Sequence, residues 1–213
     1  MKSFHISLLL LLTLLSGCAS VKVVPDQVPD GVINLKENSQ TITRNNLTVT
    51  VSPADTDMLN YNIEGMVASF NVEIQNAGEN EVTFDKDSFV LIDSDRRQYY
   101  PLTPDKLREM MAKDTYYLLP YPYVGFYYLE DYELAQFKNS TSSNLPYYFE
   151  LRPQELYTRA LPVEPVIPNA RINGLVYFHT DIHSLTSFTI NVYRKGASKS
   201  APPDFIFPYK VLK

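Results

Sequence analysis

Residues 68–75 place the strongest constraint on the fold, because apolar and polar side chains alternate there without a break. The apolar positions are Ala68, Phe70, Val72 and Ile74, and the polar positions are Ser69, Asn71, Glu73 and Gln75. Successive side chains of a strand point to opposite faces, so this period of two predicts a strand with one buried and one solvated face. Strands of this kind are typical of antiparallel sheets.

Similar short apolar segments recur along the chain and predict further strands. They lie at residues 47–51, 82–84, 88–92, 98–102, 172–179, 187–193 and 205–211. Residues 76–80 and 93–96 have the composition of turns. Pro208 lacks an N–H donor, which predicts that the last strand lies at a sheet edge. Seven or eight short strands with turns between them predict a mainly β fold, an antiparallel β-sandwich of two sheets.

Residues 103–167 interrupt this pattern, and we predict that they form a partly helical insertion in the sandwich. Thr103, Pro104 and Asp105 have the character of a helix start, with an N-cap, a proline in the first turn and an acid near the positive end of the helix dipole. Apolar residues follow at helical spacing, at Leu107, Met110 and Met111. A second helix is predicted from residue 153 onward.

The insertion is rich in tyrosine, since eleven of the sixteen tyrosines lie between residues 99 and 148. Tyrosine combines a rigid apolar ring with a polar hydroxyl and loses little conformational entropy on contact, which suits a binding surface. The candidate binding residues are Tyr116, Tyr117, Tyr121, Tyr123, Tyr127, Tyr128 and Tyr132. The alternative is that most of these rings cover a sheet face and hold the insertion against the sandwich.

The first twenty residues, MKSFHISLLLLLTLLSGCAS, have the order of a signal segment. Lys2 precedes an apolar stretch at residues 6–15, which as a helix is about 15 Å long, half of a bilayer core. This length is too short to span a membrane and predicts a signal peptide. The stretch ends in Leu-Ser-Gly-Cys, with the cysteine at position 18, and this ending resembles a bacterial lipobox.

The lipobox resemblance implies cleavage before Cys18 and a diacylglyceryl group on its thiol. Cys18 is the only cysteine, so the chain forms no internal disulfide, and a lipid on the sulfur removes an oxidisable thiol. Ala19, in place of an aspartate, resembles the outer-membrane sorting signal of enteric-type bacteria. The implied location is the bacterial cell envelope, with the lipid in the outer membrane and the domain facing the periplasm. The alternative is a secreted protein with an unmodified cysteine near its cleavage site.

The predicted organisation has three parts. Residues 1–17 are the signal peptide, residues 18–46 a lipidated amino terminus and tether, and residues 47–213 the sandwich domain with its insertion. The lipobox, the segment NVEIQN at 71–76 and the segment PNARINGLVYF at 168–178 together resemble bacterial envelope lipoproteins with an immunoglobulin-like, telokin-like domain of unknown function. The resemblance implies an immunoglobulin-like sandwich and brings no activity with it.

Charge and motif content argue against several function classes. Residues 1–17 hold one lysine and no acid, so the remainder has 18 basic and 24 acidic residues, a net charge of −6. Such a domain has no electrostatic match to nucleic acid. The sequence contains no serine nucleophile elbow, phosphate-binding glycine loop or HExxH segment. We therefore predict that the protein is not an enzyme and uses no cofactor.

His179, Asp181 and His183 form the cluster that most resembles a metal site. Alternate residues of a continuous strand share a face, so two imidazoles and a carboxylate at this spacing could bind zinc. The interpretation that we favour is a turn between two strands, in which the three side chains point apart and bind no metal.

The sequence thus predicts a lipid-anchored, non-enzymatic envelope lipoprotein whose Tyr-rich insertion binds another envelope protein. The first alternative is a lipoprotein that binds a glycan or a small molecule with the same tyrosines, Glu130 and Asp131. A metal-dependent enzyme at His179, Asp181 and His183 is the second alternative.

Overall fold

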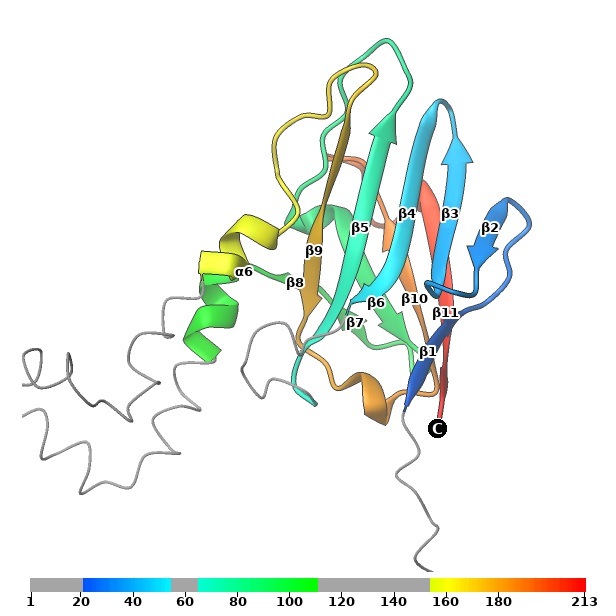
Figure 1. Cartoon of the computed structure of the whole chain (residues 1–213), viewed down its shortest axis with the longest axis vertical. Coiled ribbons are helices and arrows are strands. Elements are labelled where there is room, and N and C mark those ends of the chain that lie inside the picture. Colours follow the sequence, from blue (N-terminus) through cyan, green and yellow to red (C-terminus); the bar gives the residue numbers. More distant parts are fainter. Residues whose placement is uncertain (1–20, 55–64, 111–153) are drawn as a thin grey trace, which may run out of the picture.

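The computed structural model of the chain describes residues 21–54, 65–110 and 154–213. These residues form two antiparallel sheets that pack face to face (Figure 1). Sheet A has the strand order β1-β11-β10-β6-β7, and sheet B has the order β2-β3-β4-β5-β9-β8. The predicted mainly β fold with two antiparallel sheets is confirmed. Within the described ranges, no helix is long and apolar enough to cross a membrane.

The elements have the following bounds. Sheet A consists of β1 (Lys22–Pro25), β6 (Phe89–Asp93), β7 (Gln98–Tyr99), β10 (Ser187–Val192) and β11 (Phe205–Leu212). Sheet B consists of β2 (Gly31–Asn34), β3 (Ser39–Arg44), β4 (Leu47–Ala54), β5 (Ala68–Asn76), β8 (Pro101–Leu102) and β9 (Arg171–Phe178). The helical elements are η2 (Lys86–Ser88), α6 (Gln154–Arg159), η3 (Ile182–Ser184) and a stretch at residues 104–110.

Phe70 on β5 lies at the centre of the core between the sheets. Its side chain is fully buried, and the alternation predicted for this strand is confirmed by the burial of Val72 and Ile74. The centre of the Phe70 ring lies 5.4 Å from the centre of the Phe188 ring and 6.0 Å from that of the Tyr209 ring, both on sheet A. Aromatic side chains bury large apolar areas, so this cluster is the main hydrophobic contact between the two sheets.

Tyr209 also joins the sheets by a hydrogen bond. Its hydroxyl on β11 donates to the Val51 carbonyl oxygen on β4 at 2.7 Å. Burial raises the pKa of Tyr209 above its ordinary value, so the hydroxyl remains a neutral donor.

The prediction that Pro208 marks an edge strand is wrong, because β11 lies between β1 and β10. The N–H and C=O of a strand residue point to the same neighbour. The Pro208 carbonyl accepts the Asp26 N–H at 2.8 Å beyond the end of β1, so the missing N–H faces that side and not β10. The Asp26 carbonyl is instead satisfied by the Gln40 side-chain amide at 2.9 Å. An interior proline is tolerated for this reason.

The tether predicted at residues 18–46 is also corrected, because β1, β2 and β3 lie within it. β1 pairs with β11 in sheet A, and β3 pairs with β4 in sheet B. The sequence of β3 shows no alternation of apolar and polar residues, because the polar residues Ser39 and Gln40 are buried as well as Ile42. Residues 22–44 are therefore part of the sandwich.

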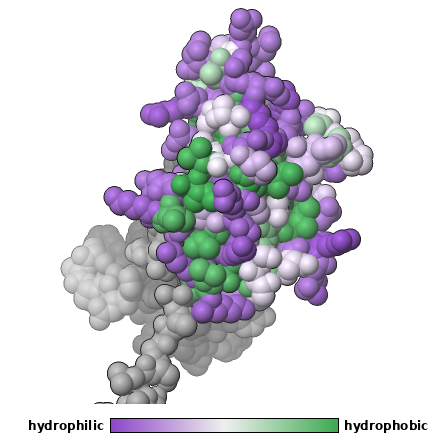
Figure 2. All heavy atoms as spheres, turned by 90° about the vertical axis from the view of Figure 1, so that its right-hand side faces the viewer, coloured by the Kyte–Doolittle hydropathy of each residue, from purple (hydrophilic) through white to green (hydrophobic). Residues whose placement is uncertain are grey.

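The edge strands of the two sheets, as formed by the described residues, are all short, which limits edge-to-edge association. β1 and β2 have 4 residues each, and β7 and β8 have 2 each. β2 bears the strongly exposed apolar side chain Val32, and Leu35 follows it. Figure 2 shows the side of the molecule where β1, β2 and β11 lie, with apolar groups interspersed among polar ones.

Residues 160–167, which the sequence analysis assigned to the insertion, are joined to the sandwich at two positions. Ala160 forms a bridge with Leu175, and Val166 forms a bridge with Val82 and is buried in the core. Of the strand predicted at residues 82–84, only the bridge at Val82 forms. The segment at 98–102 divides into β7 and β8, which belong to different sheets.

Gly174 on β9 is predicted to resist any larger side chain. A Cβ at this position would lie 2.5 Å from the Leu161 Cα and 2.7 Å from the Ala160 carbonyl carbon, both backbone atoms. We expect Gly174→Ala to lower the free energy of unfolding by about 1–3 kcal/mol, the usual cost of overpacking. Urea unfolding followed by circular dichroism measures this. Asn173→Ala, at an exposed neighbour, is the control, and equal stability of both variants would contradict the close approach.

Candidate functional site

Several predicted site residues fall outside the described residues. They are Cys18, Tyr116, Tyr117, Tyr121, Tyr123, Tyr127, Tyr128 and Tyr132. The structure does describe the two segments from which the Tyr-rich sequence leaves and to which it returns, residues 104–110 and α6. We call these two segments the stem.

The first segment of the stem begins as predicted. The Thr103 hydroxyl accepts the Lys106 N–H at 3.2 Å, which is the contact of an N-cap residue. Leu107 is fully buried and packs in a small hydrophobic cluster with Val67, Leu175 and Tyr177. This cluster holds the stem against sheet B (Figure 1).

The two segments of the stem contact each other. The Tyr157 hydroxyl of α6 donates to the Asp105 carboxylate at 2.6 Å, and this hydrogen bond raises the pKa of Tyr157. The Arg108 guanidinium lies 5.9 Å from the centre of the Tyr157 ring, within the range of a cation–π contact. The chain therefore leaves and re-enters the sandwich at one place.

Tyr177 lies beneath the stem and has an unusual environment. Burial raises the pKa of Tyr177 to about 12, so its hydroxyl is neutral at physiological pH. Within the described part of the chain, this buried hydroxyl has no hydrogen-bond partner.

His179, Asp181 and His183 are not brought together as metal ligands. Asp181 is the N-cap of η3, and its carboxylate accepts the His183 backbone N–H at 2.9 Å. No group of three His, Cys, Asp or Glu side chains in residues 21–54, 65–110 and 154–213 has the arrangement of a metal site. The structure places these residues in a turn between β9 and β10, the interpretation favoured from the sequence.

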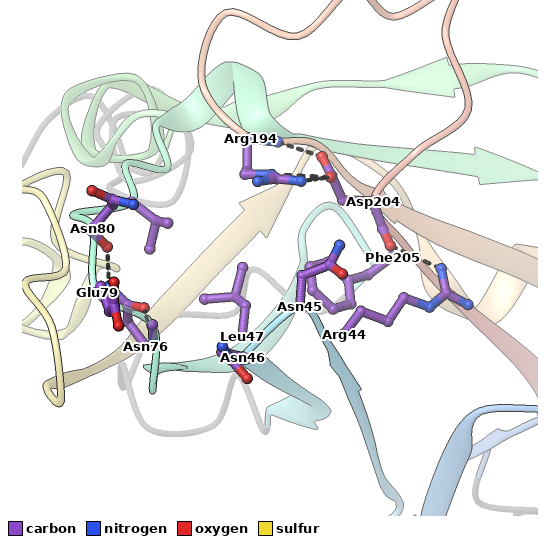
Figure 3. A pocket seen from close by; sticks show the side chains of 12 residues that line it. Arg44, Asn45, Asn46, Leu47, Asn76, Glu79, Asn80, Arg194, Asp204 and Phe205 are labelled. Atoms are coloured by element: carbon purple, nitrogen blue, oxygen red, sulfur yellow. Dashed lines mark hydrogen bonds and ion pairs between the residues drawn. The ribbon is translucent and has the colours of Figure 1, made fainter.

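A pocket of about 340 Å³ lies at one end of the sandwich, and sequence reasoning did not find it (Figure 3). Three connections form it: the β3–β4 turn, the turn after β5 and the loop between β10 and β11. The lining includes Phe205, at the start of β11, whereas the start of β1 pairs with the end of β11. The pocket and the start of β1 are thus separated by the length of β11, roughly 25 Å. We call it the distal pocket.

One wall of the distal pocket is a tight turn of two asparagines. Asn45 and Asn46 have φ angles of 51° and 61°. Positive φ at both central residues defines the type I′ turn, which matches the twist of a hairpin, and asparagine tolerates this conformation. The signal for it was present in the sequence as Arg-Asn-Asn-Leu before the strand at 47–51.

Charged side chains form a second wall. The Arg194 guanidinium donates to Asp204 Oδ1 through Nε at 3.0 Å and Nη2 at 2.8 Å, and its backbone N–H donates to Oδ2 at 3.0 Å. Arg44 donates to the Asp204 carbonyl oxygen at 2.9 Å and to Asp30 at 2.8 Å. Both arginines are therefore neutralised by neighbouring groups.

Asn76 fixes the third wall. Its side-chain amide is buried and donates to the carbonyl oxygens of Asn80 at 2.8 Å and Val166 at 2.9 Å. Its side-chain oxygen accepts the Gly78 N–H at 2.9 Å. Asn76 thus connects the turn after β5 to the segment before β9, the two segments singled out in the sequence.

The Asp204–Arg194 pair predicts an acid-sensitive contribution to stability. Burial of Asp204 favours its neutral form, but hydrogen bonds and charge from Arg194 outweigh it, so the pKa of Asp204 lies below its ordinary value of 3.8. A carboxylate with a lowered pKa stabilises the folded chain above that ordinary value, and the contribution is lost as the pH falls further.

We therefore expect Asp204→Asn to be less stable than the wild type at neutral pH and equally stable well below pH 3.8. Urea unfolding at both pH values measures the difference. Asp93→Asn is a useful comparison, because the pKa of Asp93 is also lowered but this residue lies at the end of β6 that is away from Asp204. A stability difference for Asp204→Asn that does not change with pH would contradict the assignment.

No protein-family model matches the chain, and no curated protein matches it. Among solved structures, it is similar to a Bacillus subtilis protein described as a "putative lipoprotein (ycdA)", with 11% sequence identity and a TM-score of 0.39. The alignment covers 86% of this chain and 39% of that one, so this chain spans well under half of its length. These values place the chain in no family, and its function is inferred from its own residues.

Proposed function

We propose that the protein is a lipid-anchored, non-enzymatic binding module of the bacterial envelope. The lipobox at Cys18 supplies the anchor, and Ala19 supports an outer-membrane position facing the periplasm. The Tyr-rich segment of the insertion contacts another envelope protein. At the finer level, the sandwich is of the immunoglobulin-like kind that the sequence resembles.

The observation that supports this proposal is the stem. Residues 104–110 and α6 contact each other through Tyr157 and Asp105 and are held on sheet B by the buried Leu107. Both ends of the Tyr-rich segment are thus attached to one site on a rigid sandwich. Fixing both ends of a binding segment lowers the entropy lost when it contacts a partner.

Because β1 starts at Lys22, within the predicted tether, the lipid anchor is joined to the sandwich by a short segment. Lys22, the first residue of β1, lies four positions after Cys18, and a chain of this length spans at most about 14 Å. The lipid therefore holds the β1 end of the sandwich close to the membrane surface in place of a long tether. The distal pocket, at the other end of β11, then faces away from the membrane.

Deleting residues 115–132 should abolish capture of the partner without unfolding the sandwich. The stem contacts are kept, and shortening the loop changes its closure entropy by only about 0.5 kcal/mol. Cross-linking in intact cells measures capture, and urea unfolding measures stability.

The control for the deletion is Tyr100→Ser, which removes an exposed tyrosine outside the deleted segment and leaves the stem contacts in place. We expect this control to retain the cross-linked partner. If the deletion variant also retains it, the Tyr-rich segment is not the binding surface.

A further inference from the structure

We propose that the distal pocket binds a neutral saccharide unit. This site is separate from the Tyr-rich contact proposed above, because the described residues that line it belong to three connections of the sandwich itself. The proposal therefore stands or fails independently of the partner protein. The volume of the distal pocket, about 340 Å³, lies within the usual range for small-molecule sites.

The charges around the pocket favour an uncharged ligand. The lining contains two cationic residues, Arg44 and Arg194, and two anionic ones, Glu79 and Asp204. Arg194 is paired with Asp204, and Arg44 with Asp30. A phosphate or carboxylate ligand would have to compete with these carboxylates for the guanidinium groups, so neither is favoured.

The remaining polar groups match hydroxyls. The side chains of Asn45, Asn46, Glu79 and Asn80 are exposed, and within the described residues no hydrogen bond engages their amides or carboxylate. Figure 3 shows the Asn45–Asn46 turn on one side of the pocket and Glu79 and Asn80 on the opposite side. An amide offers both a donor and an acceptor, and a sugar hydroxyl requires both.

The pocket also contains an apolar part. Leu47 and Phe205 are buried side chains of the core whose surfaces reach the pocket, and Val82 lies beside them. A sugar ring presents C–H groups on its faces and hydroxyls around its edge. Aliphatic and aromatic carbons below an arrangement of amides can contact both kinds of surface at once.

The walls are fixed before any ligand arrives. The asparagine turn is held by the β3–β4 hairpin, and the Ala77 N–H donates to the Asn46 carbonyl oxygen at 2.7 Å. Asn76 holds the turn that carries Glu79 and Asn80 through its three hydrogen bonds. The backbone that carries these side chains is therefore held in place, which lowers the entropy lost when a small polar ligand binds.

The test is isothermal titration calorimetry of the lipidated chain with neutral disaccharides. The probes are diacetylchitobiose, cellobiose, maltose and lactose, each at millimolar concentration. The detergent must have no sugar headgroup, since such a headgroup would occupy the same site. We expect saturable binding of at least one disaccharide. Absence of heat above dilution for all four probes would overturn the proposal.

Asn46→Gly is the decisive variant, because it removes the amide and keeps the turn. Glycine is well suited to the second central position of a type I′ turn, so the fold should be preserved. Loss of one hydrogen bond worth about 1 kcal/mol corresponds to roughly fivefold weaker binding. Asn38→Gly is the matched control, since Asn38 also has a positive φ, 49°, but does not line the pocket.

We expect Asn46→Gly to bind the disaccharide about fivefold or more weakly and Asn38→Gly to bind it like the wild type. Equal affinities for the two variants would place the saccharide elsewhere, for example on the tyrosines, and would overturn the proposal. Urea unfolding of both variants establishes that a loss of affinity is not a loss of fold.

Discussion

Replacing Phe70 by alanine should lower the free energy of unfolding by about 3–5 kcal/mol, the cost of removing a buried phenylalanine. The ring is fully buried at the centre of the sandwich. Besides the two rings of sheet A, it packs against Phe178, with 6.0 Å between the ring centres. Its loss would leave a cavity between the sheets. Since whole domains are stable by about 5–15 kcal/mol, this single change should remove a large part of the total.

The measurement for Phe70→Ala is urea unfolding followed by circular dichroism. Asn71→Ala, at the adjacent position on the opposite face of β5, is the matched control and should change stability by less than about 0.5 kcal/mol. A comparable loss for both variants would contradict the assignment of the two faces of β5.

Replacing Asn76 by alanine should have the second largest effect, lowering the free energy of unfolding by about 2–4 kcal/mol through the loss of its three side-chain hydrogen bonds. The change removes the side-chain partner of the Gly78 N–H and of the carbonyl oxygens of Asn80 and Val166, although the Val166 oxygen still accepts the Val82 N–H at 3.1 Å. An unpaired buried polar group costs about 1–3 kcal/mol, and these groups are only partly accessible to water. The backbone hydrogen bonds between Asn76 and residues 169 and 170 remain, so we expect the turn after β5 to loosen at the wall of the distal pocket without detaching from the segment before β9.

The control for Asn76→Ala is Gln75→Ala, because Gln75 is exposed at the preceding position of the same strand. Unfolding in urea gives the stability of both variants, and amide hydrogen exchange at residues 77–80 and 166–170 reports the local effect. Unchanged exchange in these segments would show that Asn76 does not connect them.

The sequence predicted strands well where one face is apolar throughout. β5 and β10 follow this rule, with Phe188, Ile190 and Val192 buried on β10. β3 does not, because Ser39 and Gln40 are buried and remove the contrast between its faces. The burial of a polar side chain can be predicted only when its hydrogen-bond partner is known, and Gln40 of sheet B donates to the carbonyl oxygen of Asp26, which follows β1 of sheet A.

The position of Pro208 shows a second limit of predicting strand order from the sequence. A proline is expected at an edge because it removes one donor, and the sequence does not reveal which neighbour that donor would face. In the structure the missing donor faces the end of β1, where the Gln40 side chain replaces it. Strand order therefore depended on a contact between residues far apart in the sequence.

The helix start at Thr103 and the distal pocket also differ in how well the sequence predicts them. The helix start at Thr103 was predictable because an N-cap and its helix are local features, and the contact between Thr103 and Lys106 confirms it. The distal pocket was not predictable, because it combines residues 44–47, 76–82 and 194–205. Its local signals, two adjacent asparagines and Asn76, indicated turns and not a common site.

The central claim is tested most directly by photo-cross-linking in intact cells. A photoreactive amino acid at Tyr123 samples the Tyr-rich segment, and the same residue at Tyr100 samples an exposed tyrosine of the sandwich. The account predicts one reproducible cross-linked envelope protein from position 123, none from position 100, and loss of the product in Cys18→Ala. No product from position 123, or the same product from both positions, would contradict it.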